Sequence, residues 1–200
     1  MKSIVIAVDP AVDLAVAASM VGGLEAYLLH DDLYQTIVTE TPNGTQRNQM
    51  TGGDLLTRLY RLQQQRAVLQ AEQIQQLEML QQAMDEICSS LQTRFRQKLQ
   101  ADIRASLNML RWFLQDCPTN LRQAAIEFPF EMRNRQRMEE CVKAVGEEID
   151  EELIKPIETI DKQIQSLTVH APFIWATALE PMFPKDTYWY LYRAIVEVSD

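Results

Sequence analysis

The stretch that decides the fold is Leu77–Cys117, LEMLQQAMDEICSSLQTRFRQKLQADIRASLNMLRWFLQDC. Apolar residues recur in it every three or four positions, a period of about 3.6 residues that is typical of one amphipathic helix. They are Leu77, Leu80, Met84, Ile87, Leu91, Phe95, Leu99, Ile103, Leu107, Leu110, Leu114 and Cys117. Glycine and proline, the two strongest helix breakers, are absent from Asp54 to Cys117. The sequence therefore predicts a mainly α protein, an elongated helical bundle with one very long helix at about 70–117.

The breaker-free stretch also predicts where that helix starts. Leu55, Leu59 and Leu62 belong to an earlier apolar row, but that row fails at Arg66 and Gln73. We therefore expect a turn near residues 64–70. Ser89-Ser90 marks the candidate position of a second bend.

Shorter helices are predicted on both sides. Asp9-Pro10 combines a helix-capping aspartate with a proline at the first helical position, which predicts a helix from there to about His30. After Pro118 we expect helices at about 119–127, 130–145 and 147–167, the first ended by Phe128-Pro129-Phe130. Pro156 should kink or split the last one, because proline costs about 3 kcal/mol inside a helix.

Strand signals occur in two places. The Asn43-Gly44 pair between β-branched and polar flanks predicts a β-hairpin at 33–50, with strands at roughly 33–40 and 45–50. The C-terminal tail, 169–200, has strand-like composition at Tyr188–Tyr192 and Ala194–Val198. We expect a small sheet that joins the tail to the hairpin. Residues 1–8 are predicted to be a short strand or an apolar tether.

These elements are expected to form a single helical domain, 1–200. In this organisation the hairpin is an insertion, and the aromatic, proline-containing tail packs on the bundle. Seven of the fifteen aromatic residues lie in the tail: Phe173, Trp175, Phe183, Tyr188, Trp189, Tyr190 and Tyr192.

Composition excludes several classes of protein. The chain is 46% hydrophobic and 24% charged, with a net charge of −9 and a pI near 4.8. A nucleic-acid binder should carry a basic face, so nucleic acid is not an expected partner. No run of 18 apolar residues occurs, so we expect no membrane span. Three widely spaced cysteines and the interruption of the apolar N-terminus at Asp9 and Pro10 indicate a cytoplasmic protein without a signal peptide.

Known catalytic motifs are absent from the sequence. His30 and His170 are the only histidines. Neither belongs to the Glu-x-x-His motif of a di-iron bundle or to an HExxH zinc motif, so the sequence excludes both kinds of site in their usual form. The glycines form neither a GxGxxG nor a Walker loop, and there is no GxSxG elbow. We expect no cofactor and no metal site, and the sequence favours a non-enzymatic role over an unrecognised enzyme.

A few residues remain as candidates for a ligand site or an interface. Arg135 lies on a buried helical row, where we expect a structural ion pair, with an anionic ligand as the alternative. His170 is a boundary histidine or, alternatively, part of a pocket. The aromatic side chains fill a core or anchor an interface. The full set is Arg135, His170, Trp112, Trp175, Tyr188, Trp189, Tyr190 and Tyr192.

Two functions are consistent with these features. The first is a non-enzymatic, soluble helical protein that binds another protein or itself, because a helix longer than its own core exposes apolar surface. The alternative is a small-molecule or anion-binding domain, with its pocket between the helices and the C-terminal tail. Twelve glutamines between Gln63 and Gln100 give a neutral helix surface that is either solvated or an uncharged interface.

Overall fold

The computed structural model describes residues 6 and 8–196, which divide into two compact units. The N-terminal unit comprises Asp9–Asp102, and the C-terminal unit begins at Ile103. The expectation of a single domain stays a prediction, because two compact units can still unfold as one. The element predicted for residues 1–8 falls almost entirely outside the described residues.

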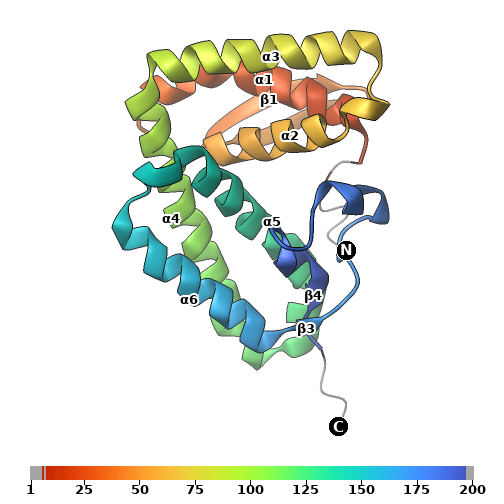
Figure 1. The fold of residues 1–200 in the computed structure, drawn as a ribbon, viewed down its shortest axis with the longest axis vertical. Coiled ribbons are helices and arrows are strands. Elements are labelled where there is room, and N and C mark those ends of the chain that lie inside the picture. Colours follow the sequence, from red (N-terminus) through yellow and green to blue (C-terminus); the bar gives the residue numbers. More distant parts are fainter. Residues whose placement is uncertain (1–5, 7, 197–200) are drawn as a thin grey trace. The chain divides into compact units, whose positions relative to one another are not determined.

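The fold is mainly α with a small antiparallel hairpin, which confirms the predicted class (Figure 1). The N-terminal unit contains α1 (Pro10–Leu29), β1 (Gln35–Thr41), β2 (Gly44–Met50), α2 (Gly52–Gln64), the 3-10 helix η1 (Arg66–Val68), α3 (Ala71–Ser90) and the start of α4 (Gln92–Asp116). The predicted turn near 64–70 is therefore present between α2 and α3.

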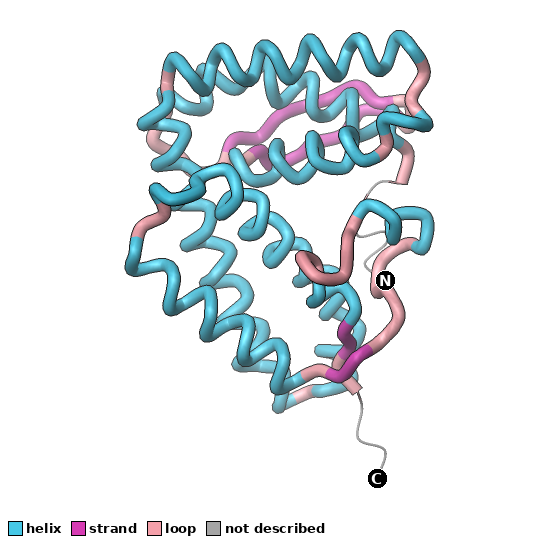
Figure 2. The backbone as a smooth tube through the Cα atoms, in the orientation of Figure 1, coloured by secondary structure: helices cyan, strands magenta, loops and turns pink. Residues whose placement is uncertain are grey.

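Helix α1 is the centre of the N-terminal unit. It begins as predicted, because the Asp9 carboxylate accepts a hydrogen bond from the Ala11 amide at 2.9 Å and Pro10 follows. It packs against α2, α3 and β1 (Figure 2). Its buried residues point to several faces, as expected of a helix enclosed by other elements: Val12, Asp13, Leu14, Val16, Ala17, Met20, Val21, Leu24, Tyr27 and Leu28.

The predicted hairpin is confirmed. Thr41 pairs with Gly44 across the Pro42-Asn43 turn, and Gly44 has a φ of 101°, a conformation that side chains disfavour. Burial alternates along β1, with Ile37 and Thr39 inward and Val38 outward. The hairpin thus has one face on the core of its unit and one polar face in solvent.

The start of α2 is held against α4 at very close range. Thr51 caps α2, and the Gly53 amide donates to the Asp102 carboxylate at 2.9 Å. A Cβ added at Gly52 would lie 2.8 Å from Cδ2 of Leu99, which is shorter than real side chains allow. Glycine at this position therefore permits the close approach of the two helices.

The region predicted as one long helix is helical, but it forms two helices. α3 ends at Ser90, Leu91 adopts φ −119° and ψ 34°, and α4 starts at Gln92. The Leu91 amide still donates to Ile87 and the Phe95 amide to Leu91, each at 2.9 Å. The break costs little because both bonds survive, and it lies beside the predicted candidate bend at Ser89-Ser90.

The helix boundary predicted at Phe128-Pro129-Phe130 is wrong, and of the two outcomes expected at Pro156, a kink or a split, the split does not occur. Helix α5 (Leu121–Val145) runs through Pro129, and helix α6 (Glu151–Leu167) runs unsplit through Pro156. Burial of Phe128 and Met132 on either side of Pro129 offsets the missing backbone bond. The segment before α6 is a separate 3-10 turn, η3 (Gly146–Glu148), so α6 begins later than predicted.

The tail forms turns where strands are predicted. Tyr188, Tyr190 and Leu191 are all buried, which a strand with one buried face cannot achieve for adjacent residues. The tail elements are β3 (Val169–His170), η4 (Thr177–Met182), η5 (Trp189–Tyr192) and β4 (Arg193–Ala194).

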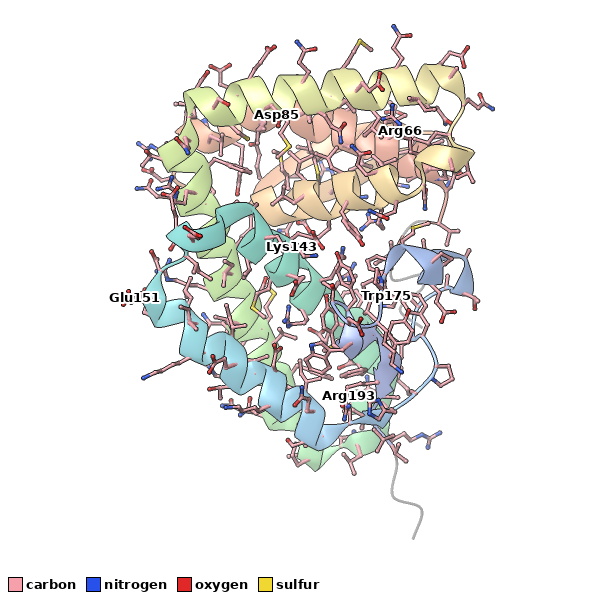
Figure 3. All side chains as sticks on the ribbon, viewed as in Figure 1. Arg66, Asp85, Lys143, Glu151, Trp175 and Arg193 are labelled. Atoms are coloured by element: carbon pink, nitrogen blue, oxygen red, sulfur yellow. The ribbon has the colours of Figure 1, made fainter. Side chains whose placement is uncertain are left out.

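Among the residues that the structure describes, no strand of the tail pairs with the hairpin, so the predicted joint sheet is not found there. β3 pairs with β4, and β1 with β2, in two separate sheets. Of the strand predicted at 194–198, residues 197 and 198 lie outside the described residues. Arg193, labelled in Figure 3, donates to the carbonyls of Gln165 and Thr168 and so caps the C-terminus of α6.

Candidate functional site

Six of the eight candidate residues form one cluster, in which aromatic residues of the tail pack against α5. Trp175 donates to the Pro129 carbonyl at 2.7 Å, and its ring packs edge-on against Phe183. Phe183 in turn contacts Tyr188, whose ring centre is 6.2 Å from that of Tyr190. Ring contacts connect the cluster members Arg135, Trp175, Tyr188, Trp189, Tyr190 and Tyr192, with Phe173 and Phe183 between them.

Arg135 forms the expected structural ion pair. Its Nε and Nη2 donate to both carboxylate oxygens of Asp161 on α6, at 2.7 and 3.0 Å, and its Nη1 donates to Glu139 at 2.9 Å. Burial lowers the pKa of Arg135, but the bonds to Asp161 and the nearby negative groups raise it above its ordinary value. We call these three residues the Arg135 cluster. Both ends of the guanidinium fork are thus bonded to carboxylates of the chain itself.

A second polar group lies beside the Arg135 cluster on α5. The Tyr188 hydroxyl donates to Glu140 at 2.6 Å and accepts from Lys143 at 2.9 Å. Burial raises the pKa of Glu140, and the bond from Tyr188 opposes that rise. Lys143, labelled in Figure 3, is the exposed member of this tail triad. The triad fixes η5 to α5 by bonds that the sequence analysis did not foresee.

Tyr190 differs from Tyr188 in the hydrogen bonding of its hydroxyl group. It is fully buried, and its hydroxyl has no hydrogen-bond partner within the described part of the chain. Burial raises its pKa well above the ordinary value, although Arg135, 4.9 Å from the ring centre, opposes the rise. Tyr190 therefore contributes apolar packing and a cation–π contact, at the cost of an unsatisfied polar atom.

The remaining two candidates are exposed. His170 pairs with Arg193 in the short β3–β4 ladder, where it is the boundary residue that the sequence predicts. Trp112 is 68% exposed on α4, and Met109, one turn earlier on the same face, is also exposed. No hydrogen bond, ion pair or ring contact between described residues involves Trp112. An exposed tryptophan of this kind is the unusual feature of the surface.

The described residues provide no constellation for metal or thiol chemistry. No group of three His, Cys, Asp or Glu side chains there could hold a metal ion. Cys117 and Cys141 are buried and Cys88 is half-buried, and burial raises the pKa of Cys88 and Cys117 to about 11. Thiols with a raised pKa are poor nucleophiles at neutral pH.

A buried ionic group in the N-terminal unit was missed by the sequence analysis. Asp13 on α1 is 1% exposed and accepts from Arg61 at 2.7 and 2.9 Å and from Arg58 at 2.6 Å. Burial, and then the neighbouring Arg61, lower the pKa of Arg58 against the attraction of Asp13. These three residues form the Asp13 cluster. A lone acid on the inward face of an apolar helix was the signal in the sequence.

Among the described residues, α1 is long and apolar enough to cross a membrane by length and composition alone. Its most apolar 18-residue window has a mean hydropathy of 1.5, and 56% of that window is buried within the structure. Core helices and signal sequences meet the same criterion. The absence of a membrane span therefore stays a prediction.

No protein family, curated protein or solved structure that was compared with the chain matches it.

Proposed function

We propose that the protein acts by binding another protein chain through the outer face of α4. This surface, the Trp112 face, is centred on Trp112 and consists of Ala105, Asn108, Met109, Arg111, Trp112, Gln115 and Asp116. The observation that carries the proposal is the exposure of Trp112, 68% of whose surface is in water. With two thirds of its surface in water, the tryptophan lacks about 3 kcal/mol of the hydrophobic stabilisation that full burial would give. Tryptophan is also among the residues most enriched at the centres of interfaces.

The geometry of α4 supports the same proposal. Leu107, Leu110 and Leu114 are buried, and Trp112 is two residues from each of the last two, on the opposite side of the helix. Trp112 thus points directly away from the core of its own unit. The buried leucines, and not Trp112, therefore supply most of the packing of this part of α4 within the chain.

The anion-binding alternative is less well supported. It depends on a free guanidinium fork at Arg135, whereas Asp161 and Glu139 occupy both ends of that fork. His170 lies at the start of the tail, in the short β3–β4 ladder, and makes no hydrogen bond to Arg135. Anion binding stays an untested prediction.

Site-specific photo-crosslinking tests the proposal. A photoreactive amino acid replaces Met109 in one variant and Ile126 in a matched control, because Ile126 is 67% exposed on α5 of the same unit. The expected result is a product with one protein, identified by mass spectrometry, from position 109 and not from position 126. That protein, once purified, should bind the native chain and should bind Trp112→Ala at least about tenfold more weakly. Identical products from both positions, or none from position 109, would contradict the proposal.

A further inference from the structure

The Trp112 face has an uncharged centre with charges of opposite sign on its two edges. In the seven-residue repeat of two parallel packed helices, the contact line alternates steps of three and four residues, so Ala105, Asn108, Trp112 and Gln115 would form the central seam. Trp112, Asn108 and Gln115 are exposed, and Ala105 is half-buried. Arg111 lies on one edge of the seam and Asp116 on the other, and both are exposed. Met109 lies on the same edge as Asp116.

The spacing of Arg111 and Asp116 along α4 favours one relative direction for two packed copies of that helix. When two parallel helices pack side by side, a residue on one edge of the seam faces the residue five positions later on the other edge of its partner. Arg111 and Asp116 are five residues apart and lie on opposite edges. Two copies of α4 packed in parallel would therefore bring each Arg111 opposite the other copy's Asp116. A two-fold axis makes the same pair twice.

We propose that the partner is a second copy of this chain, bound through parallel packing of the Trp112 faces. This inference rests on the proposed function, because it names the partner that binds the same surface. The two Trp112 side chains cover each other at the centre, and two Arg111–Asp116 pairs fix the register. A wholly acidic partner would attract Arg111 and repel Asp116, and a wholly basic partner would do the reverse. The net charge of −9 on each copy does not prevent contact, because charges farther apart than about 8 Å are screened at physiological salt.

Sedimentation velocity at physiological salt tests this arrangement with four chains: the native protein, Trp112→Ala, Arg111→Glu and Asp116→Arg. The native protein should form dimers as its concentration rises. Trp112→Ala should weaken the dimer at least about tenfold, because it removes the apolar centre. Each charge reversal should also weaken it about tenfold or more, because it places like charges opposite each other twice. Arg122→Glu, an exposed reversal on α5, is the control and should leave the dimer unchanged.

Mixing the two charge-reversed proteins is the decisive measurement. In a mixed pair, the new glutamate faces the new arginine, and the native Asp116 faces the native Arg111. An equimolar mixture should therefore dimerise with an affinity close to that of the native protein, although neither variant does so alone. In an antiparallel pairing residues on the same edge would meet, so the native protein would already place Arg111 opposite Arg111 and Asp116 opposite Asp116. The single reversals would then not weaken the dimer, and the mixture would associate more tightly than the native protein.

Three results would overturn self-association: a native protein that stays monomeric at every concentration, reversals without effect, or a mixture that does not associate. These results are distinguishable from failure of the proposed function. A monomer that still crosslinks one other protein through position 109 retains the interaction surface and changes only its occupant. Circular dichroism of each variant checks that the substitutions, all at exposed positions, leave the helices intact.

Discussion

The two units bury ionic clusters of opposite composition. In the N-terminal unit one carboxylate, Asp13, is held between Arg58 and Arg61. In the C-terminal unit one guanidinium, Arg135, is held between Asp161 and Glu139. Each central residue is almost fully buried, but the outer members differ. The side chain of Arg58 is 20% exposed but that of Arg61 only 5%, whereas both outer members of the other cluster, Asp161 and Glu139, are 23% and 18% exposed.

This difference indicates how much each unit depends on its central residue. A buried charge that loses its partner costs several kcal/mol, whereas a charge near the surface can recover water. Removal of Asp13 would leave Arg61 buried without its carboxylate. Removal of Arg135 would leave two carboxylates that already have part of their surface in solvent. We therefore expect the N-terminal cluster to be the more sensitive of the two.

The largest effect is expected at the Asp13 cluster. Asp13→Asn should lower the free energy of unfolding by about 3–5 kcal/mol, because two guanidinium groups then share no carboxylate. Replacing all three members by apolar residues, Asp13→Leu with Arg58→Met and Arg61→Leu, should recover most of that loss. Urea denaturation followed by circular dichroism measures both. A loss below about 1 kcal/mol for Asp13→Asn would show that the cluster contributes little.

A smaller loss is expected at the Arg135 cluster. Arg135→Met should cost about 2 kcal/mol, since Asp161 and Glu139 can be rehydrated and only the cation–π contact with Tyr190 is lost outright. Arg135→Lys should fall between this variant and the native protein, because lysine keeps the charge but not the two-pronged hydrogen bonding. The same denaturation experiment compares them. If Arg135→Met costs as much as Asp13→Asn, the contrast between the units is wrong.

The two buried tyrosines sharpen the comparison within the C-terminal unit. Tyr188→Phe removes the hydroxyl that donates to Glu140, so we expect a loss of about 1–2 kcal/mol. Tyr190→Phe removes a buried hydroxyl without a hydrogen bond, so stability should be unchanged or rise by up to about 1 kcal/mol. Thermal unfolding of the matched pair separates the two. Equal losses would mean that the Tyr190 hydroxyl is bonded in solution.

The smallest effect depends on pH. Because burial raises the pKa of Glu140 above its ordinary value of 4.5, the folded protein holds that proton more tightly than the unfolded chain. The unfavourable contribution of Glu140 is therefore absent below pH 4.5 and grows as the pH rises through the folded pKa. Glu140→Gln keeps an acceptor for Tyr188 and should stabilise the protein at pH 7 by on the order of 1 kcal/mol. The gain should vanish in acid, and a gain independent of pH would contradict this explanation.

Much of the fold follows from local patterns. The cap at Asp9-Pro10, the hairpin signalled by Asn43-Gly44 and the turn near 64–70 are set by short-range chemistry, and the structure contains all three, with the hairpin turn at Pro42-Asn43. The break at Leu91 lies next to the bend that Ser89-Ser90 marks in the sequence, whereas the continuity of α5 through Pro129 depends on tertiary packing. A prediction based on propensity cannot foresee that Phe128 and Met132 offset the cost of a proline between them.

The candidate residues divide in the same way. The burial of Arg135 follows from its helical row with Met138 and Val142, but the identity of its partners, Asp161 and Glu139, depends on the fold. Asp13 stands out as a lone acid in an apolar helix, but its partners Arg58 and Arg61 depend on the fold. Glu140 and Lys143 were missed because they are two of many charged residues on α5, and only the fold shows which of these meet Tyr188. The exposure of Trp112 could have been foreseen, since it lies opposite the row that contains Leu110 and Leu114.

The contact at Gly52 also bears on the search for distant relatives. Because a methyl group at position 52 would meet the end of the Leu99 side chain, a homologue with alanine or serine there would have to move or shorten that leucine, or separate α2 from α4. Substitutions at 52 and 99 should therefore be correlated during evolution. A search profile that weights this pair of positions together should identify sequences that share the fold at levels of identity too low for ordinary alignment.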